Sequence, residues 1–234
     1  MLRNDNRLLK NGDNAFKAQI VQSYVSFNSS QYNYVYLGIS GVTANDPFHM
    51  HYETPFGITK YDYTYDALYN QVIPATGEGS YKEFYFSGDL NALYLISFNN
   101  PYYYSGYYYQ GDLIKLMYQF PNLNSFQMVF GGGYYRQSIF SQDISNVVFP
   151  NKLKTFKIND STISGQVSTI TNFNIIEDLE LDNCLLSENL TDINFVNLRK
   201  LSLYGLSYLS GSLNDAITKN PNFNSISLQD CYLW

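Results

Sequence analysis

The amino-acid sequence predicts a mainly β protein, in which an N-terminal antiparallel sheet or sandwich precedes a short parallel solenoid of about six rungs. Two observations lead to this prediction. Up to about residue 88, apolar residues alternate with other residues in short runs, which is typical of half-buried strands. From there on, one six-residue pattern recurs six times, with apolar first, fourth and sixth positions. Such a repeat buries its apolar face only by stacking on its neighbours.

Three segments follow from these patterns. Residues 1–14 are polar and are interpreted as an N-terminal arm, residues 15–88 as a β-rich docking or capping domain, and residues 89–234 as the solenoid. In the middle segment we expect strands in the apolar runs near 16–27, 32–39, 61–65 and 81–86, while 66–72 fits either one helical turn or a strand. We interpret the run at 81–86 as a hairpin or cap that closes the first edge of the solenoid, because repeat arrays need capped ends.

The six copies of the pattern begin at Leu90, Leu123, Leu153, Ile176, Leu198 and Phe223. The last three intervals, of 22 to 25 residues, fall within the period of about 20–29 residues that leucine-rich repeats have. The first two intervals are longer. The excess is placed in the Gly-bearing segments 101–111 and 131–136, which are expected to be insertions or loops.

The segment from about residue 88 to the end therefore resembles a leucine-rich-repeat solenoid, whose consensus is L-x-x-L-x-L-x-x-N/C-x-L. The fourth copy fits this consensus best, with Ile176, Leu179, Leu181, Cys184 and Leu186. The sixth copy also matches it, with Cys231 and Leu233 at the last two consensus positions. The resemblance implies a repeat fold of a kind that usually acts by binding, and it names no reaction.

The two cysteines occupy the same position in the fourth and sixth copies. Two stacking steps separate their Cα atoms by roughly 10 Å, and a disulfide needs less than about 7 Å. We therefore predict two buried free thiols, as suits a reducing site of synthesis. The first ten residues lack the apolar run of a secretion signal. We expect either cytoplasmic synthesis and assembly or a signal that has been removed.

Composition and charge limit the partners. The net charge is −6 and no basic run is present, which argues against nucleic-acid binding. No apolar stretch approaches the length of a membrane span, so no membrane insertion is expected. With 24 Tyr and 16 Phe residues, the chain has more aromatic side chains than a core needs. Some of them are expected at the surface.

On each rung, alternate strand residues should point outward, such as Ala92, Tyr94 and Ile96 on the first. On the fourth rung this places Asp178, Glu180 and Asp182 on one face. They could form a cation site or a glycosidase pair. We favour ordinary cross-strand pairing with Lys157 and Lys200 on the flanking rungs.

His49, His51 and Glu53 are the other residues with metal character, and on a strand they would share a face. Such imidazoles can hold zinc or nickel when a third ligand is present. The flanking Pro47 and Pro55 favour a plain loop instead, so no metal and no cofactor is expected.

Tyrosines give the strongest indication of a contact surface. A candidate partner-binding set comprises Tyr102, Tyr103, Tyr104, Tyr107, Tyr108 and Tyr109, with Tyr134, Tyr135, Arg136 and Trp234. The first six flank Ser105–Gly106, which has the character of a hairpin tip, and Tyr is enriched in interfaces. The alternative is a self-packed loop folded over the sheet. Trp234 lies beside a final strand that no helix follows, so another subunit or the N-terminal domain is expected to cover it.

These features favour a non-enzymatic structural protein that works through protein–protein contacts or self-association. The polar arm, the absence of a signal and the aromatic composition point to a virion component, such as a bacteriophage tail, fibre or capsid-associated protein, assembled in the host cytoplasm. A carbohydrate-binding or adhesion module at the cell surface, using the tyrosine hairpin, is the alternative. A metal-dependent hydrolase using His49 and His51 is a third hypothesis. No phosphate loop, dinucleotide fingerprint or G-x-S-x-G motif is present.

Overall fold

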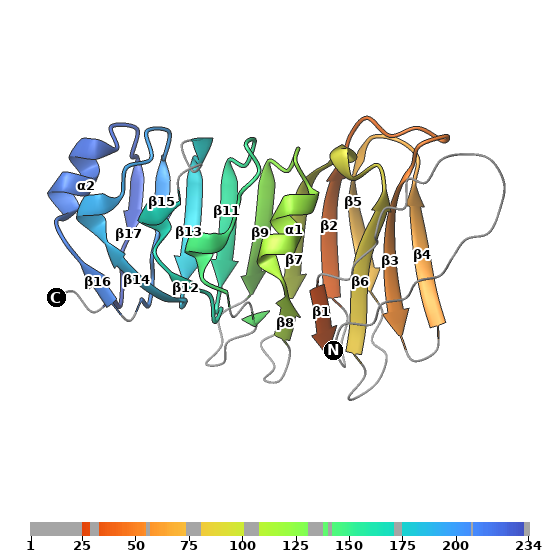
Figure 1. Cartoon of the computed structure of the whole chain (residues 1–234), viewed down its shortest axis with the longest axis horizontal. Coiled ribbons are helices and arrows are strands. Elements are labelled where there is room, and N and C mark those ends of the chain that lie inside the picture. Colours follow the sequence, from red (N-terminus) through yellow and green to blue (C-terminus); the bar gives the residue numbers. More distant parts are fainter. Residues whose placement is uncertain are drawn as a thin grey trace.

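The computed structural model describes residues 25–28, 33–54, 57–73, 81–100, 108–130, 138–139, 142–170, 175–206 and 208–231. The protein is mainly β, with a six-stranded, an eight-stranded and a three-stranded sheet (Figure 1). The strands are β1 (Val25–Asn28), β2 (Asn33–Ile39), β3 (Phe48–Thr54), β4 (Gly57–Tyr63), β5 (Ala67–Ile73), β6 (Tyr81–Gly88), β7 (Leu93–Asn100), β8 (Tyr108–Gly111), β9 (Ser125–Phe130), β10 (Ser138–Ile139), β11 (Thr155–Asn159), β12 (Ser164–Gly165), β13 (Asp178–Asp182), β14 (Leu185–Asn189), β15 (Lys200–Ser202), β16 (Tyr208–Ser210) and β17 (Ser225–Ser227). The helices are α1 (Leu113–Gln119) and α2 (Leu213–Lys219), with short 3₁₀ turns η1 (Leu90–Ala92), η2 (Ile144–Asn146), η3 (Val167–Thr169) and η5 (Leu190–Asp192).

Strands from the six repeat copies lie side by side in the eight-stranded sheet, whose order is β17-β15-β13-β11-β9-β7-β2-β5. From β7 to β17 every pairing is parallel, and we call these six strands the parallel array. Phe156 lies opposite Phe126 on one side and Leu179 on the other, so the fourth positions of successive copies are aligned. The predicted parallel pairing of the copies is confirmed.

The first copy begins three residues later than its apolar spacing predicts. Phe126 pairs with Ile96, and Met128 pairs with Phe98. The aligned pattern is therefore Leu93-x-x-Ile96-x-Phe98 rather than one that begins at Leu90, which lies in η1. The predicted outward residues of this rung are wrong for the same reason, because Ala92 and Ile96 are buried. The sequence offered apolar residues at both spacings, and η1, with its Asp89 cap, decides between them.

Antiparallel strands complete both large sheets at the N-terminal end. β2 pairs with β7 and with β5, and β1 pairs with β6 and β8 in the six-stranded sheet of order β10-β8-β1-β6-β3-β4. Both sheets therefore contain strands from either side of the boundary expected near residue 88. The edge of the parallel array is closed by β2, so the interpretation of the run at 81–86 as that cap is wrong.

Two other segments resolve differently from the prediction. The segment 66–72, for which a helical turn and a strand were both open, is mostly strand β5. Residues 48–54 form strand β3 between β4 and β6, which corrects the interpretation of this region as a loop. Of the tyrosines expected on a third strand, Tyr63 is buried in β4, while Tyr65 lies beyond the strand and is exposed.

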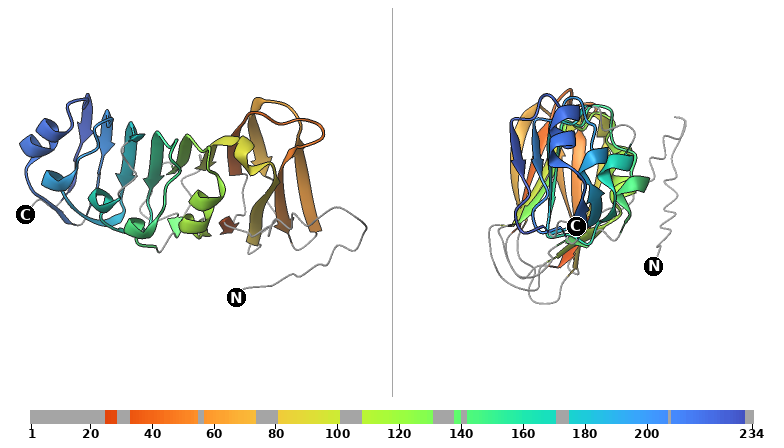
Figure 2. Two further views of the ribbon diagram at one scale, coloured as in Figure 1. Left: turned by 45° about the horizontal axis from the view of Figure 1, so that its top comes forward. Right: turned by 90° about the vertical axis from the view of Figure 1, so that its left-hand side faces the viewer.

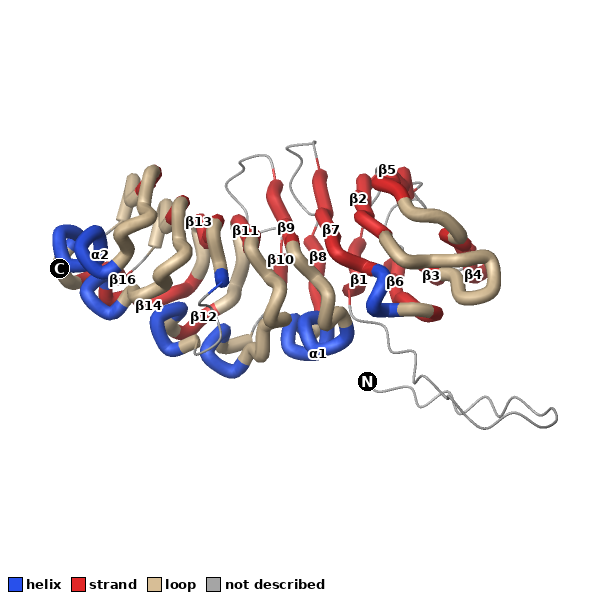
Figure 3. The backbone as a smooth tube through the Cα atoms, turned by 90° about the horizontal axis from the view of Figure 1, so that it is seen from above, coloured by secondary structure: helices blue, strands red, loops and turns tan. Residues whose placement is uncertain are grey.

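Each step of the array repeats a strand, a turn, a second short strand and a helical turn, so that β12, β14 and β16 form a small sheet of their own. Seen from above, the helical turns lie along the side opposite β9, β11 and β13 (Figure 3), and the turned views show the layered arrangement (Figure 2). The turns after β11, β13, β15 and β17 have positive φ at Asp160, Asn183, Gly205 and Asp230, residue types that tolerate the left-handed region. These four residues each lie seven positions after the start of a copy.

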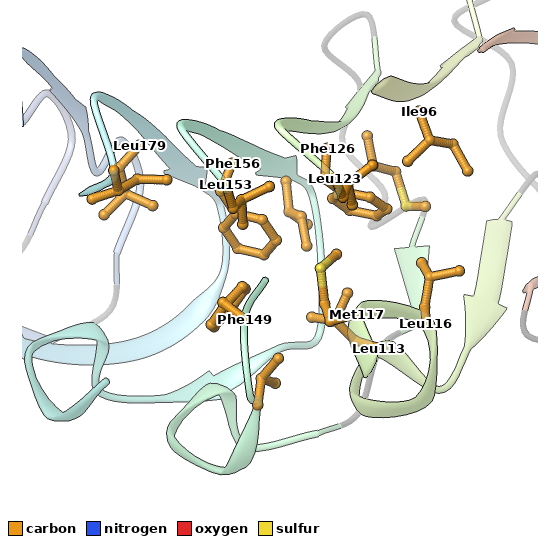
Figure 4. Close-up of a cluster of buried hydrophobic side chains, with 14 of the residues drawn as sticks. Ile96, Leu113, Leu116, Met117, Leu123, Phe126, Phe149, Leu153, Phe156 and Leu179 are labelled. Atoms are coloured by element: carbon orange, nitrogen blue, oxygen red, sulfur yellow. The ribbon is translucent and has the colours of Figure 1, made fainter. Parts of the chain in front are cut away.

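The core runs through the array between its two layers. Leu153, Phe156 and Ile158 are buried, as are the equivalent residues of the neighbouring copies. From the other side, Leu116 and Met117 of α1 point toward Phe126 and its neighbours (Figure 4). A continuous apolar core therefore lies beneath the outward strand residues.

Candidate functional site

The outward face of the parallel array carries a network of charged side chains. The Nζ atom of Lys157 lies 2.7 Å from an Asp178 oxygen and 3.4 Å from a Glu180 oxygen. Burial lowers the pKa of Lys157, but the two carboxylates outweigh burial and the pKa is raised. The predicted cross-strand pairing with Lys157 is confirmed. For Lys200, no ion pair with a carboxylate is found among the described residues.

Two further carboxylate oxygens of the trio, Glu180 Oε1 and Asp182 Oδ1, also have partners. Glu180 accepts a hydrogen bond from Asn159 Nδ2 at 3.0 Å. Asp182 accepts bonds from Ser202 Oγ at 2.7 Å and from the Tyr204 backbone N–H at 3.0 Å. Burial raises the pKa of Asp182 more than these bonds lower it. The trio therefore ties three adjacent strands together. Within the described part of the chain, no group of three or more His, Cys, Asp or Glu side chains is placed to hold a metal ion.

Charged side chains also lie at both ends of the strands in the last copies. Basic Lys154, Arg199 and Lys200 lie where strands begin, and Glu177 pairs with Lys154 at 2.7 Å and with Arg199 at 3.7 Å. Acidic residues occupy the turns where strands end, including the exposed Asp230. In the fifth and sixth copies, basic Arg199 and Lys200 thus lie at a strand start and acidic Asp230 lies after a strand end, whereas Glu177 and Asp178 place acidic residues at the start of β13.

The two histidines lie on β3, where their rings are 6.1 Å apart between centroids. His49 Nδ1 is 2.7 Å from Asp62 Oδ1, and Lys60 Nζ is 2.9 Å from the same oxygen. The hydrogen bond from Lys60, above all, lowers the pKa of Asp62. The backbone of Glu53 continues the same strand, and its side chain lies outside the described residues.

His51 has a different partner, because its Nε2 lies 2.8 Å from Ser87 Oγ. Burial, followed by the nearby Lys60 and His49, lowers the pKa of His51. A serine nucleophile activated by a triad needs one imidazole between the hydroxyl and the carboxylate. Here Asp62 and Ser87 bind different imidazoles, so this surface does not have the geometry of a catalytic triad.

Most of the tyrosine surface predicted from the sequence lies outside the described residues, namely Tyr102, Tyr103, Tyr104, Tyr107, Tyr134, Tyr135, Arg136 and Trp234. Tyr108 and Tyr109 begin strand β8. Tyr109 pairs with Phe27 of β1 on one side and with Ser138 of β10 on the other. The strand is therefore flanked by β1 and β10, which corrects the expectation that Tyr109 forms one arm of a hairpin.

Exposed apolar side chains elsewhere were not predicted. Leu68 on β5 is 71% exposed, and Leu213 and Ile217 on α2 are 41% and 46% exposed. The spacing of Leu213 and Ile217 indicates one face of a helix. Ser212, with Asp215 three residues later, is a helix-start signal that could have located α2.

Two buried polar side chains position the C-terminal rungs. Glu188 on β14 accepts backbone N–H bonds from Val167 at 2.6 Å and Ser168 at 3.3 Å, and so caps η3 of the preceding rung. Asn220, at the end of α2, accepts a bond from the Phe195 N–H and donates to the Ile193 carbonyl. Both side chains connect one copy to another, so their role is structural.

No protein-family model matches the chain, and no curated protein or solved structure matches it either. Among the described helices, none is long and apolar enough to cross a membrane.

Proposed function

We propose that this chain is a non-enzymatic structural protein that works through protein contacts, built on a leucine-rich-repeat-like solenoid of six rungs. The parallel array supports the solenoid, because its aligned copies alternate with short second strands and helical turns. The cysteines support it too. Cys184 Sγ donates to the Ile158 carbonyl at 3.6 Å, and Cys231 Sγ donates to the Leu203 carbonyl. Each cysteine occupies the Asn/Cys position of the repeat consensus, and its thiol bonds to a backbone carbonyl of the preceding copy.

The observation that carries the proposal is the state of the sheet edges. In the described residues, β5 pairs only with β2, and β17 pairs only with β15. Neither strand contains a charged residue or a proline, although these are the usual protections of an edge. The edge strand of the other large sheet, β4, carries Lys60 and Asp62. Unprotected edges beside exposed apolar side chains such as Leu68 are surfaces that fit other protein chains.

We further propose that the assembly is a virion, put together in the host cytoplasm. Both cysteines are free, with Cys184 buried and Cys231 half-buried, and free thiols suit a reducing compartment. The prediction of unpaired thiols is confirmed, while the expected full burial of Cys231 is wrong. The thiol of Cys231 belongs to the last copy, where no further described strand covers it.

Particle composition tests this proposal. Gradient-purified particles from the source are analysed by quantitative mass spectrometry, and the chain is expected at a stoichiometry comparable with that of other coat components. Its presence only in the soluble fraction, with none in particles, would exclude the virion role. Cross-linking within the intact particle then names the neighbouring proteins.

A carbohydrate-binding function is the second candidate, and an aromatic surface on β2 supports it. A Cβ atom at Gly38 would lie 2.7 Å from the Tyr94 ring, so the glycine lets this ring lie over the outward side of the strand. Nearby on β2, Tyr36 is 37% exposed. Flat aromatic surfaces of this kind can stack on sugar rings. A glycan array comparing the wild-type chain with Tyr36→Ser tests the candidate, and binding that is absent from the wild type or equal in both rejects this surface.

A further inference from the structure

Among the described strands, β17 has a neighbour only on the side of β15, and its other edge, here called the free edge, has a defined hydrogen-bonding pattern. The Ser225 N–H bonds inward to the Arg199 carbonyl, and the Ser227 carbonyl accepts a bond from Leu203. Since successive residues of a strand face opposite sides, the N–H and C=O of Ile226 both point away from β15. In antiparallel pairs, two directly opposite residues exchange both bonds in this way. The edge is therefore suited to pairing about Ile226.

The same end of the molecule exposes the apolar interior of a rung. In the fifth copy Leu198, Leu201 and Leu203 are no more than 2% exposed. Their counterparts in the sixth copy, Phe223, Ile226 and Leu228, are only partly buried. The cross-section of the array is thus left half-covered at its C-terminal end.

Helix α2 adds apolar side chains that face the same way. Lys219 Nζ donates to the Thr191 carbonyl of the preceding rung, which places that flank of the helix against its neighbour. Ile217 lies about 200° away from Lys219 around the helix axis, and Leu213 lies one turn before Ile217. The exposed pair Leu213 and Ile217 therefore projects away from the preceding rung, toward the free edge of β17. Figure 1 shows α2 and β17 together at this end.

Charges on this end favour an antiparallel copy of the same surface. The outward side chains Ser225 and Ser227 are small and uncharged, whereas β13 and β15 carry outward charges. Antiparallel pairing about Ile226 sets Ser225 opposite Ser227, with no like charges in contact. It also places Asp230 of one copy opposite Asn222 of the other, at the end of the strands where Arg199 lies one strand further in.

The shape of this apolar surface indicates which partner binds to it. A surface shaped like the interior of the array is matched by another such surface, and the opposite end of the array is closed by β2 and β5. We propose that two copies of this chain associate tail to tail, through β17, Leu213 and Ile217, with the two β17 strands antiparallel about Ile226. This inference rests on the proposed structural function and names a second copy as the partner at this surface. Because one patch serves both copies, the contact closes as a two-fold dimer.

Light scattering of the full chain, over about a hundredfold range of concentration, measures association. The wild type is expected to form a dimer. Ile217→Asp should weaken it by about tenfold or more, because a charge then enters the apolar contact. Thr218→Asp, on the solvent side of the same helix, is the matched control and should leave the dimer unchanged. Ile226→Pro removes the outward N–H and should also abolish pairing, and circular dichroism checks that the variant folds.

Disulfide trapping tests the alignment. Opposite residues beside a hydrogen-bonded pair have Cα atoms about 4.5 Å apart, within the range for a disulfide. A mixture of Ser225→Cys and Ser227→Cys chains should therefore cross-link under mild oxidation, located by peptide mass spectrometry. Either variant alone should cross-link poorly, because like positions are about 8 Å apart in this alignment.

A monomeric wild type at every concentration would overturn the inference. A dimer that survives Ile217→Asp and Ile226→Pro, or equal cross-linking by single variants and the mixture, would also overturn it. These results are separable from a failure of the proposed function. A monomer that is still found in purified particles refutes the dimer alone, and a trapped dimer that is missing from particles refutes the virion role alone.

Discussion

The parallel array and the antiparallel strands at the N-terminal end differ in how far apart in the sequence their paired strands lie. In the array, each strand pairs with the strand of the next copy, the apolar spacing recurs in the aligned copies, and a turn with positive φ follows β11, β13, β15 and β17. At the N-terminal end, β1 pairs with β6 and β8, which are far from it in sequence. Local signals therefore specify the array, whereas long-range pairing specifies the other region. Substitutions at matched residues of the two regions should show this difference.

The largest expected effect concerns the contacts between rungs. Asn220 is fully buried, accepts the Phe195 N–H at 2.6 Å and donates to the carbonyls of Ile193 and Ala216. Asn220→Ala should lower the free energy of unfolding by about 3–5 kcal/mol, since the buried Phe195 N–H and Ile193 carbonyl lose their bonds to the side chain. Urea denaturation measures this effect. Asn222→Ala, which removes one exposed bond to Val196, should cost about 0.5 kcal/mol. Equal losses in the two variants would contradict this account of rung contacts.

Two glycines with positive φ, one in each region, allow the cost of a substitution to be compared between the regions. Gly211 in the array has φ 86°, and a Cβ there would lie 2.0 Å from Asn189 Oδ1. Gly41 in the N-terminal region has φ 84°, with nothing within 4 Å of such a Cβ. Gly211→Ala should therefore cost about 2–4 kcal/mol, from backbone strain plus the clash, and Gly41→Ala about 1 kcal/mol from strain alone. Thermal unfolding of both variants checks the difference, which should vanish if Asn189 and Thr191, whose backbone nitrogen is 2.9 Å from such a Cβ, can both move aside.

The cap provided by Glu188 is expected to have a smaller effect and a dependence on pH. Glu188→Ala removes the acceptor for Val167 and Ser168 and should cost about 1–3 kcal/mol near neutral pH. Burial raises the pKa of Glu188 in the folded protein, despite its N–H donors. The unfolded chain therefore loses this proton first, at a pKa of about 4.3. The contribution of this ionisation to stability should fall as pH rises from there through the higher folded-state pKa.

The pKa of Asp182 is also raised by burial. The difference in unfolding free energy between the wild type and Glu188→Ala separates the contribution of Glu188 from that of Asp182. Urea midpoints measured from about pH 4 to pH 8 should show a steeper decline for the wild type than for the variant over this window. Parallel curves for the two proteins would mean that the Glu188 carboxyl titrates as it does in the unfolded chain.

The array could be predicted well because its signals lie close together in the sequence. Five of the six copies align in the sheet as their apolar spacing predicts. The first copy did not, since Leu90 and Leu93 both fit the spacing and only the η1 turn separates the two alignments. At Cys184 and Cys231 the stacking distance alone predicted free thiols correctly.

The N-terminal strands and the binding surface could not be derived in this way. Strand β3 places His49 and His51 on its outward side. Because these polar residues lie between Pro47 and Pro55, the amino-acid sequence of the strand resembles that of a polar loop. Pairing partners such as β2 for β7 depend on contacts between distant segments, which no local pattern encodes. The uncovered edge of the last strand is expected from the sequence, because no helix follows it, whereas the exposed apolar side chains of α2 are not.

Ion pairs on the two sheets provide the smallest expected effect. The Lys157 side chain is 20% exposed and pairs with both Asp178 and Glu180. Lys60 is 45% exposed and pairs with Asp62, which is itself 54% exposed. Lys157→Gln should therefore cost about 1 kcal/mol and Lys60→Gln about 0.3 kcal/mol, because solvent screens the exposed pair more strongly.

Repeating both measurements in about 1 M salt sharpens the test. The Lys60 effect should disappear there, while most of the Lys157 effect should remain, because its half-buried groups are screened less and stay bonded across strands. If both effects vanish together, the outward face of the array is as open to ions as the N-terminal sheet. Its charges would then contribute nothing specific to holding the rungs in register.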